Sequence, residues 1–320
     1  MKKFLQSNIN GVIFWIFIAT IIGFLSKLNF LTDICCHFRI QYLLIAITAL
    51  ILYFLFKIKD KAFVIAITAI IIVNVLEIAH CFFISPSFTT KIPAEKLIRE
   101  NKIKVGLINL LTANTKYEAV ADDIEANNPD ILILEEIDYK WSEELYNVTK
   151  KYRYRYEYLR DDNFGMAIYS NIRVKNFNTI TAGDFNELPV LTADVEINGK
   201  DAEIIAIHTT PPTSNAYFKN TKKMLYDLSE YIKHKNVPLI VAGDMNSTRF
   251  SYNYKIFIKQ TKMQDACGLF QRTWPSYWTA PLRIPLDHVF FSKHFGKLNF
   301  YTGKNVGSDH FPVYSEFYLQ

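Results

Sequence analysis

The stretch that decides the fold is Val241-Ala242-Gly243-Asp244-Met245-Asn246. The apolar run before it, residues 237–240, is typical of a buried strand, and the stretch itself ends in turn-forming residues. Asp244 and Asn246 are two positions apart, so in an extended chain their side chains project to the same side. Such a pair at a strand end could hold a water molecule and a phosphoryl oxygen near a metal. Because Asp and Asn are also ordinary turn formers, this stretch alone leaves both interpretations open.

Polar side chains of the same kind recur at other predicted strand ends. Each of six short pieces carries a carboxylate, an amide or an imidazole where a strand begins or ends. They are Ile108-Asn109-Leu110, Leu134-Glu135-Glu136, Ile207-His208-Thr209, Gly243-Asp244-Met245-Asn246, Leu286-Asp287-His288 and Ser308-Asp309-His310. Active sites built on sheets collect at strand ends, so the six pieces together predict one polar rim.

From residue 103 onward, short apolar strands, polar turns and amphipathic helices follow one another. We predict helices over 116–127 (closed by Asn128-Pro129), 141–150, 217–234 and 252–260. We predict strands over 103–110, 131–134, 154–159, 165–169, 173–180, 189–197, 202–208, 237–241, 286–291, 297–302 and 312–318. Because many strands are consecutive, hairpins and antiparallel pairing are expected rather than a doubly wound sheet.

The first 89 residues differ in composition. Three apolar runs, about 8–26, 40–56 and 62–84, are each about long enough to cross a bilayer as a helix. A cleaved signal peptide would explain only the first of them. We therefore expect a membrane anchor with three transmembrane helices over 1–86, a polar linker over 87–101, and a separate domain over 102–320.

The basic residues suggest an orientation for the anchor. The N-terminus carries Lys2 and Lys3, and the loop 57–61 carries three lysines, whereas the loop 27–39 carries two basic side chains. The positive-inside rule then places the N-terminus and the loop 57–61 in the cytoplasm. After three crossings of a plasma or inner membrane, the domain 102–320 would be extracytoplasmic. Glu77 and His80 near the outer end of the third run are either functional or interfacial.

Charge and cysteine content exclude little. Residues 1–89 carry seven basic and three acidic side chains, and the rest of the chain carries 29 and 28, so the second part has no global basic excess. This argues against a dedicated nucleic-acid surface but does not exclude a local patch. The four cysteines, Cys35, Cys36, Cys81 and Cys267, show neither a disulfide framework nor a zinc spacing.

The order and spacing of these pieces, together with Pro129-Asp130-Ile131-Leu132-Ile133-Leu134-Glu135-Glu136, resemble the endonuclease/exonuclease/phosphatase superfamily. That family includes deoxyribonuclease I, abasic-site endonucleases, bacterial sphingomyelinases and inositol-polyphosphate 5-phosphatases. The resemblance covers about residues 103–318 and indicates a membrane-anchored, bacterial-type member. It implies an α/β (α+β) fold: a four-layer sandwich of two mainly antiparallel β-sheets flanked by helices, preceded by the three transmembrane helices.

The resemblance also implies a metal site. Glu136 would be the principal ligand of a divalent cation, Mg²⁺ or Mn²⁺, and Asn109 and Asp309 would complete its surroundings directly or through water. The family usually has Gln before this Glu. Glu135 at that position leaves open which of the two carboxylates binds the metal.

Catalytic roles follow from the same resemblance. Asp244 would position or deprotonate the attacking water, and Asn246 would steady the water or the phosphate. His310, oriented by Asp287, would hold a phosphoryl oxygen or share in proton transfer. His208 would assist the leaving group, although a histidine in His-Thr-Thr-Pro-Pro could also be packed in the core.

The resulting hypothesis is a hydrolase that attacks a phosphodiester or phosphomonoester with an activated water. Its substrate would be nucleic acid, a phospholipid head group or a small phosphate ester, and no protein partner is evident. The alternative is a non-catalytic binding or scaffolding protein that retains the fold. His288 is expected to be structural, because beside Asp287 it projects to the opposite face. Trp274, Trp278 and Arg283 lie on a loop that could contact substrate.

Overall fold

The computed structural model describes residues 2–84, 101–185 and 188–320. The predicted end of the anchor at residue 86 and the predicted linker up to residue 100 lie outside these ranges. The chain forms two compact units. The first combines Met1–Ile84 with two short segments, Pro212–Lys219 and Ser247–Ile256; the second comprises Ser85–Pro211, Asn220–Asn246 and Phe257–Gln320.

The first unit is built on helices. They are α1 (Lys2–Ile22), η1 (Gly23–Leu25), α2 (Phe30–Ile34), α3 (Arg39–Leu55) and α4 (Lys61–Ile84). An apolar cluster joins the three long helices, with Ile13 from α1, Ala46 from α3 and Ile67 from α4 fully buried. Large apolar side chains also point outward: Phe54 is 82% exposed and Phe83 is 83% exposed. Such a surface fits a hydrocarbon environment better than water.

Only part of the prediction of three transmembrane helices is met. Within the described residues, two helical spans, Lys2–Leu25 and Lys61–Phe83, are long and apolar enough to cross a membrane. The predicted span 40–56 does form the apolar helix α3, but α3 has 17 residues. At 1.5 Å per residue it is roughly 26 Å long, somewhat less than a typical hydrocarbon core.

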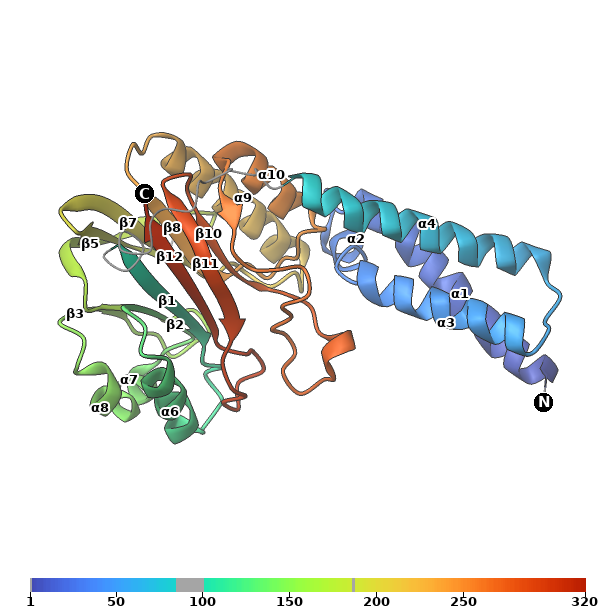
Figure 1. Cartoon of the computed structure of the whole chain (residues 1–320), viewed down its shortest axis with the longest axis horizontal. Helices are drawn as coiled ribbons and strands as arrows, with labels where there is room; N and C mark the ends of the chain where they lie inside the picture. Colours follow the sequence, from blue (N-terminus) through green and yellow to red (C-terminus); the bar gives the residue numbers. More distant parts are fainter. Residues whose placement is uncertain (1, 85–100, 186–187) are drawn as a thin grey trace. The chain divides into compact units, whose positions relative to one another are not determined.

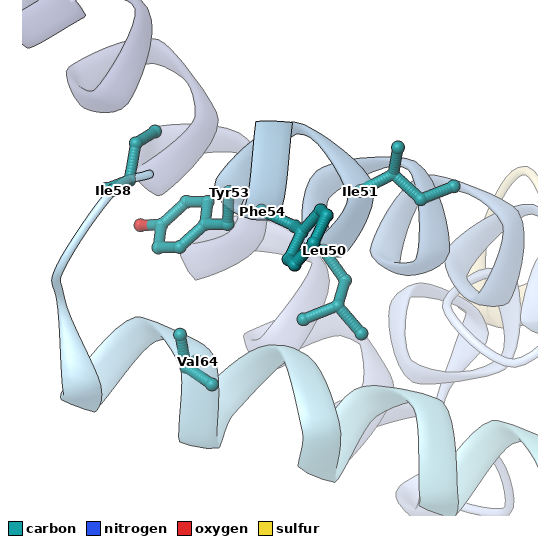
Figure 2. Close-up of a pocket in the computed structure, with 6 residues that line it drawn as sticks. All are labelled: Leu50, Ile51, Tyr53, Phe54, Ile58 and Val64. Atoms are coloured by element: carbon teal, nitrogen blue, oxygen red, sulfur yellow. The ribbon is translucent and has the colours of Figure 1, made fainter. Parts of the chain in front are cut away.

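An apolar hollow lies in this unit where α3 turns back into α4. Its volume is 460 Å³, and Figure 2 shows its lining of Leu50, Ile51, Tyr53, Phe54, Ile58 and Val64. The Tyr53 hydroxyl donates a hydrogen bond to Asn10. Because none of the six lining side chains is charged, the hollow is not a candidate site for phosphate chemistry.

The second unit contains two six-stranded mixed sheets. The first has the order β11-β12-β1-β2-β4-β3 and the second the order β5-β6-β7-β8-β10-β9. The strands of the first sheet are β1 (Lys102–Asn109), β2 (Ile131–Glu135), β3 (Tyr154–Tyr158), β4 (Met166–Ser170), β11 (Phe295–Thr302) and β12 (Val313–Leu319). Those of the second are β5 (Arg173–Thr181), β6 (Pro189–Ile197), β7 (Lys200–Ile207), β8 (Leu239–Asp244), β9 (Gln264–Asp265) and β10 (Asp287–Phe291).

Each sheet contains one parallel pair at its centre, β1–β2 in the first and β7–β8 in the second. All other paired strands are antiparallel, as predicted. A parallel pair needs a crossover connection. The helix α6 (Tyr117–Asn127) lies between β1 and β2 in the chain, and α9 (Asn215–Lys233) lies between β7 and β8.

Local sequence explains where several helices begin and end. At the end of α6, Asn128 adopts a left-handed conformation (φ 42°), and Pro129 follows, as predicted. The helix predicted over 141–150 is instead two pieces, α7 (Tyr139–Glu144) and α8 (Tyr146–Thr149). Asp138 caps α7 by accepting a hydrogen bond from the Trp141 backbone. The remaining helices are α10 (Tyr252–Thr261) and the short η2 (Ala280–Leu282).

The core follows the two-residue period of the strands. In β2, Ile131 and Ile133 belong to a cluster with residues of both sheets, whereas Leu132 and Leu134 pack with residues of α6 to α8. On the second sheet, the Phe257 ring of α10 packs edge-on against Phe290 at 5.2 Å. The sheets are therefore packed on each other and flanked by helices, with α6, α7 and α8 outside the first sheet (Figure 1).

The two parallel pairs determine where polar side chains gather. In a parallel pair the C-terminal ends of both strands lie at the same edge of the sheet. Asn109 lies opposite Glu135 at the end of β1–β2. Asp244 ends β8, and Asp287 lies opposite it at the beginning of β10. One edge from each sheet thus brings strand-end residues together.

Candidate active site

Asp244 is the centre of the polar rim. Its side chain is 2% exposed, and three other side chains approach its Oδ2 atom. His310 Nε2 lies 3.5 Å away, His208 Nε2 3.7 Å away, and Asn109 Nδ2 3.5 Å away. The other oxygen, Oδ1, accepts a hydrogen bond of 2.8 Å from the Asn246 backbone. Four of the predicted pieces therefore meet at one carboxylate.

The burial of Asp244 changes its proton affinity. Removal from water raises the pKa of Asp244 to about 7, with the charge of His310 opposing and the charge of Asp287 adding to the shift. A carboxylate with a pKa near neutrality can accept a proton from a water molecule and release it again.

His310 and Asp287 form a buried pair. His310 Nδ1 lies 2.9 Å from Asp287 Oδ2, and the His310 backbone donates to the Ser308 hydroxyl at 3.0 Å. Burial alone would lower the pKa of His310, but the charges of Asp287 and Asp244 raise it well above its usual value. Burial likewise opposes ionisation of Asp287, yet the charge and hydrogen bond of His310 lower its pKa. His310 therefore carries a positive charge at neutral pH, with Nε2 directed at Asp244.

Glu136 lies at the end of the first sheet in an unusual backbone conformation. Its φ is 58°, a region that costs a non-glycine residue roughly 1–3 kcal/mol. Its Oε1 accepts a hydrogen bond of 3.1 Å from Asn109 Nδ2, and its Oε2 accepts one of 3.2 Å from the Thr112 backbone. In this conformation the Glu136 carboxylate contacts Asn109 and Thr112 at the strand ends.

Glu135 occupies a different position. It is fully buried, and both of its carboxylate oxygens lie 3.1 Å from the Asp244 backbone nitrogen, which donates to them. Burial and the charges of Asp244 and Asp287 raise the pKa of Glu135 well above its usual value. Although Asn109 pairs with Glu135 along the backbone, its side chain contacts the carboxylate of Glu136 and not that of Glu135.

His208 follows β7 and is 4% exposed. Its ring lies 5.4 Å from the ring of Phe164. Burial and the charge of His310 lower the pKa of His208 to about 4, so its imidazole is neutral at pH 7 in the resting protein. A role in protonating a leaving group therefore requires that a bound phosphate first raise this pKa.

Asn246 and Asp309 complete the set of predicted residues. Asn246 has a φ of 44° and donates through Nδ2 to the Thr209 carbonyl at 2.8 Å. Asp309 Oδ2 accepts a hydrogen bond of 3.0 Å from Trp274 Nε1. The loop residue Trp274 therefore contacts a predicted site residue.

Three supporting residues were missed by the sequence analysis. Thr112 binds Glu136, Phe164 packs on His208, and the Thr273 hydroxyl accepts the Asp287 backbone N–H at 3.4 Å. Nothing in the sequence marks them, because threonine and phenylalanine in loops are common and their contacts are far apart in the chain.

The structural role expected of His288 is also tested by its contacts. His288 is fully buried, and its Nδ1 lies 2.8 Å from Asp265 Oδ2, which agrees with a structural role. Tyr154, Tyr156 and Tyr158 of β3 are partly buried against the core between the sheets.

The donor chemistry of the rim fits a divalent cation. The carboxylates of Glu136 and Asp309 are hard oxygen donors of the kind that Mg²⁺ and Mn²⁺ prefer. Asn109 presents its amide nitrogen to Glu136; a half-turn of the amide would present the oxygen instead. The pKa of Glu136 is raised by burial and by the charge of Asp309, which a cation would offset. One ligand atom each from Asp244, Asp287 and His310 also lies within 4.8 Å of the others.

Comparison with known proteins identifies the family of the chain. The model of the Endonuclease/Exonuclease/phosphatase family matches residues 106–310. A comparison of the sequence with curated proteins finds no match.

Several solved structures share the fold. An endonuclease/exonuclease/phosphatase from Bacteroides vulgatus has a TM-score of 0.57 at 16% identity, covering 68% of this chain and 99% of that one. The human Nocturnin catalytic domain with a bound sulfate anion has a TM-score of 0.56 at 19% identity, covering 68% and 95%. D. rerio TDP2 complexed with a single-strand DNA product has a TM-score of 0.55 at 16% identity, covering 68% and 98%.

Proposed function

Because the chain belongs to the endonuclease/exonuclease/phosphatase family, we propose that it is a divalent-metal-dependent hydrolase of a phosphodiester or phosphomonoester. The observation that carries the proposal is the convergence of His310, His208 and Asn109 on Asp244 Oδ2. Hydrolysis of a phosphate ester needs a base for the attacking water and positive charge for the phosphoryl oxygens. Asp244 and protonated His310 supply these two functions side by side.

In this proposal Asp244 accepts a proton from the attacking water. Its pKa of about 7 suits a base that works near neutral pH. Asn246 steadies the water or the phosphate through its amide, held in place by the Thr209 carbonyl. His310, fixed by Asp287, donates a hydrogen bond from Nε2 to a phosphoryl oxygen. His208, whose Nε2 lies 3.7 Å from Asp244 Oδ2, assists the leaving oxygen.

Glu136 and Asp309, with the amide oxygen of Asn109, would hold Mg²⁺ or Mn²⁺ directly or through water. When bound, the cation supplies positive charge to the phosphoryl group and the leaving oxygen. Asn109 and the Thr112 backbone hold the Glu136 carboxylate in place for this task.

The proposal includes a membrane anchor. The chain would occupy a plasma or inner membrane through three helices in 1–86, with the domain 102–320 on the extracytoplasmic side. The exposed apolar surface of α3 supports a third crossing beside α1 and α4, because side chains such as Phe54 would otherwise face water. Nucleic acid, a phospholipid head group or a small phosphate ester are the candidate substrates.

A non-catalytic protein that retains the fold is the alternative. It would have no need of a buried Asp244 beside a charged His310, since each buried charge carries a cost in stability. Both residues are present, together with the strained Glu136, which favours an enzyme.

The test is hydrolysis by the full chain purified in detergent, with Mg²⁺ or Mn²⁺ added. The substrates would be single-stranded and double-stranded DNA, RNA, sphingomyelin, phosphoinositides, nucleotides and nitrophenyl phosphate esters. We expect turnover of at least one substrate, which Asp244→Asn lowers by two or more decades. The matched control is Asp201→Asn, since Asp201 is an exposed aspartate paired with Lys175. Metal-independent turnover, or equal turnover in both variants, would contradict the proposal.

A further inference from the structure

A second group of metal-binding side chains lies in the first unit. Asp33, Cys36 and His37 are 2%, 1% and 5% exposed, and one ligand atom of each lies within 4.8 Å of the others. Asp33 lies near the end of α2, and the next two are three and four positions further on, so the three share one side of the helical turn. The group contains no residue of the candidate active site.

The two ring nitrogens of His37 have different surroundings: Nδ1 contacts Thr248, and Nε2 faces Asp33. Nδ1 lies 3.0 Å from the Thr248 hydroxyl, and it accepts a long hydrogen bond of 3.4 Å from the Thr248 backbone N–H. Nε2 is buried and makes no hydrogen bond with any residue in the described part of the chain. It nevertheless lies 3.3 Å from Asp33 Oδ2. Metal binding at Nε2 places the proton on Nδ1, where the Thr248 hydroxyl accepts it in place of the long contact from the backbone N–H.

The distance between His37 and Asp33 is that of two ligand atoms around a metal. Bond lengths of roughly 2.0–2.3 Å to tetrahedral Zn²⁺ place neighbouring ligand atoms roughly 3.3–3.8 Å apart. The His37 Nε2 to Asp33 Oδ2 separation is 3.3 Å, which falls in this range. Cys36 Sγ lies 3.8 Å from the other oxygen of the same carboxylate, Oδ1. A direct hydrogen bond between nitrogen and oxygen would be shorter, at about 2.9 Å.

Two hydroxyl groups orient the ligands from outside. Ser251 donates to Asp33 Oδ1 at 2.8 Å, which leaves Oδ2 toward His37. Thr248 fixes the ring of His37 through Nδ1. Metal-binding His and Asp side chains are commonly oriented by such contacts.

We propose that Asp33, Cys36 and His37 bind a divalent cation of the Zn²⁺ type, with water in a fourth position. A thiolate, an imidazole and a carboxylate suit a borderline-soft ion, unlike the hard oxygen donors of the rim. Two anionic ligands neutralise a dication, so the buried site carries no net charge. Thr248 and Ser251 belong to Ser247–Ile256, which follows Asn246 directly in the sequence, so the metal fixes this segment to the loop before α3.

The test uses Co²⁺ as a coloured substitute for Zn²⁺. The full chain, stripped of metal in detergent, is titrated with Co²⁺ in excess Mg²⁺, on a Glu136→Gln background that removes the proposed ligand of the rim. We expect one equivalent of Co²⁺ to bind with a thiolate-to-cobalt charge-transfer band, and Zn²⁺ to displace it. Cys36→Ala should abolish the band. Cys35→Ala is the matched control, because Cys35 is adjacent, partly exposed and outside the group.

A folded protein without this band, or a Cys36→Ala variant that keeps it, would overturn the proposal. Such a result would mean that no metal binds here and that a protonated His37 forms an ion pair with Asp33. Thermal unfolding gives a second measurement that does not depend on any variant. Zn²⁺ should raise the melting temperature of the Mg²⁺-saturated wild type by several degrees, since a ligand of the native state stabilises it. No rise in the wild type would equally overturn the proposal.

Discussion

At the residue scale, the two adjacent glutamates are expected to differ in their effect on activity. Glu136 faces Asn109 and the Thr112 backbone at the rim, whereas Glu135 is buried beneath the Asp244 backbone. Glu136→Gln should lower Mg²⁺-dependent turnover by two or more decades, because the principal charge for the metal is lost. Glu135→Gln should lose less than tenfold, because a Gln oxygen can still accept from Asp244. Turnover of both variants, with circular dichroism to check folding, decides this; the reverse order would assign the metal to Glu135.

Glu135 also predicts a dependence of stability on pH. Its pKa is raised by burial and by neighbouring charges, so the native protein holds a proton that the unfolded chain releases above about pH 4. Stability contributed by this group therefore falls as pH rises from the unfolded pKa toward the raised native pKa. Glu135→Gln removes the loss, and each 1 kcal/mol recovered raises the melting temperature by roughly 2–4 °C at this size.

Melting curves at pH 5 and pH 8 in the presence of a chelator measure this effect. The variant should gain more over the wild type at pH 8 than at pH 5. A gain that is the same at both values, or a loss at pH 8, would show that Glu135 is not a buried proton-holding carboxyl in the metal-free protein.

His208 gives a prediction that depends on the leaving group. If His208 protonates the leaving oxygen, His208→Ala should slow poor leaving groups by two or more decades. A nitrophenyl phosphodiester needs little protonation and should retain far more activity. His310→Ala should damage both substrates alike, since its proposed contact is with the phosphoryl group. Turnover of each variant on each substrate is the measurement, and equal losses for His208→Ala would remove it from the leaving-group role.

The polar site residues at the strand ends could be predicted from the sequence, whereas the residues that contact and orient them could not. Acidic and imidazole side chains at strand ends stand out because they interrupt apolar runs, as His208 does after Ile207. The contact of Trp274 with Asp309 spans 35 positions and has no local signature. The shift of His208 to a pKa of about 4 depends on burial and on the charge of His310, which no spacing records.

At the scale of elements, the site depends on the close approach of β7 and β8. A Cβ atom at Gly243 would lie 1.7 Å from the Ile207 carbonyl oxygen and 2.9 Å from Glu135 Oε1. Gly243→Ala must therefore push the two strands apart, at a cost on the order of 1–3 kcal/mol, and displace both His208 and Asp244. We expect a lower melting temperature and a loss of turnover together.

Gly11→Ala is the control for this change, because nothing lies within 4 Å of a Cβ at Gly11 and alanine favours a helix. It should leave turnover and melting temperature nearly unchanged. Full activity in Gly243→Ala would mean that the parallel pair does not set the position of Asp244.

Most strands could be predicted because apolar runs bounded by turn residues give each strand a local signal. The two-residue strand β9 and the five-residue helix α2 are too short to give one, and both were missed. The break between α7 and α8 was missed because the helical spacing continues through Leu145. The order of the strands in each sheet could not be predicted either, because the parallel pairing of β1–β2 and β7–β8 depends on how the crossover helices pack.

At the scale of the whole molecule, the two compact units do not follow a single division of the sequence. The sequence predicted an anchor over 1–86 and a separate domain over 102–320. The first compact unit also takes in Pro212–Lys219 and Ser247–Ile256, which are far from the N-terminus in sequence. Contacts such as Lys255 to Glu77 at 3.0 Å and Thr248 to His37 at 3.0 Å hold the second of these segments. These contacts could not be predicted from the spacing of apolar residues, because each is a single polar contact between positions far apart in the sequence.

In the proposed membrane anchor, the number of crossings decides on which side of the membrane the candidate active site lies. Two helices meet the length of a span, and α3 has only 17 residues, but α3 carries exposed apolar side chains and shares an apolar cluster with α1 and α4. A short helix can still cross where the bilayer thins around it. With three crossings, a reporter that is active only in the cytoplasm should be inactive when fused after Gln320. The same reporter fused after Lys59 should be active, because the lysine-rich loop 57–61 is expected in the cytoplasm. If instead the fusion after Gln320 is active and the fusion after Lys59 is inactive, α3 does not cross, and the candidate active site lies on the cytoplasmic side.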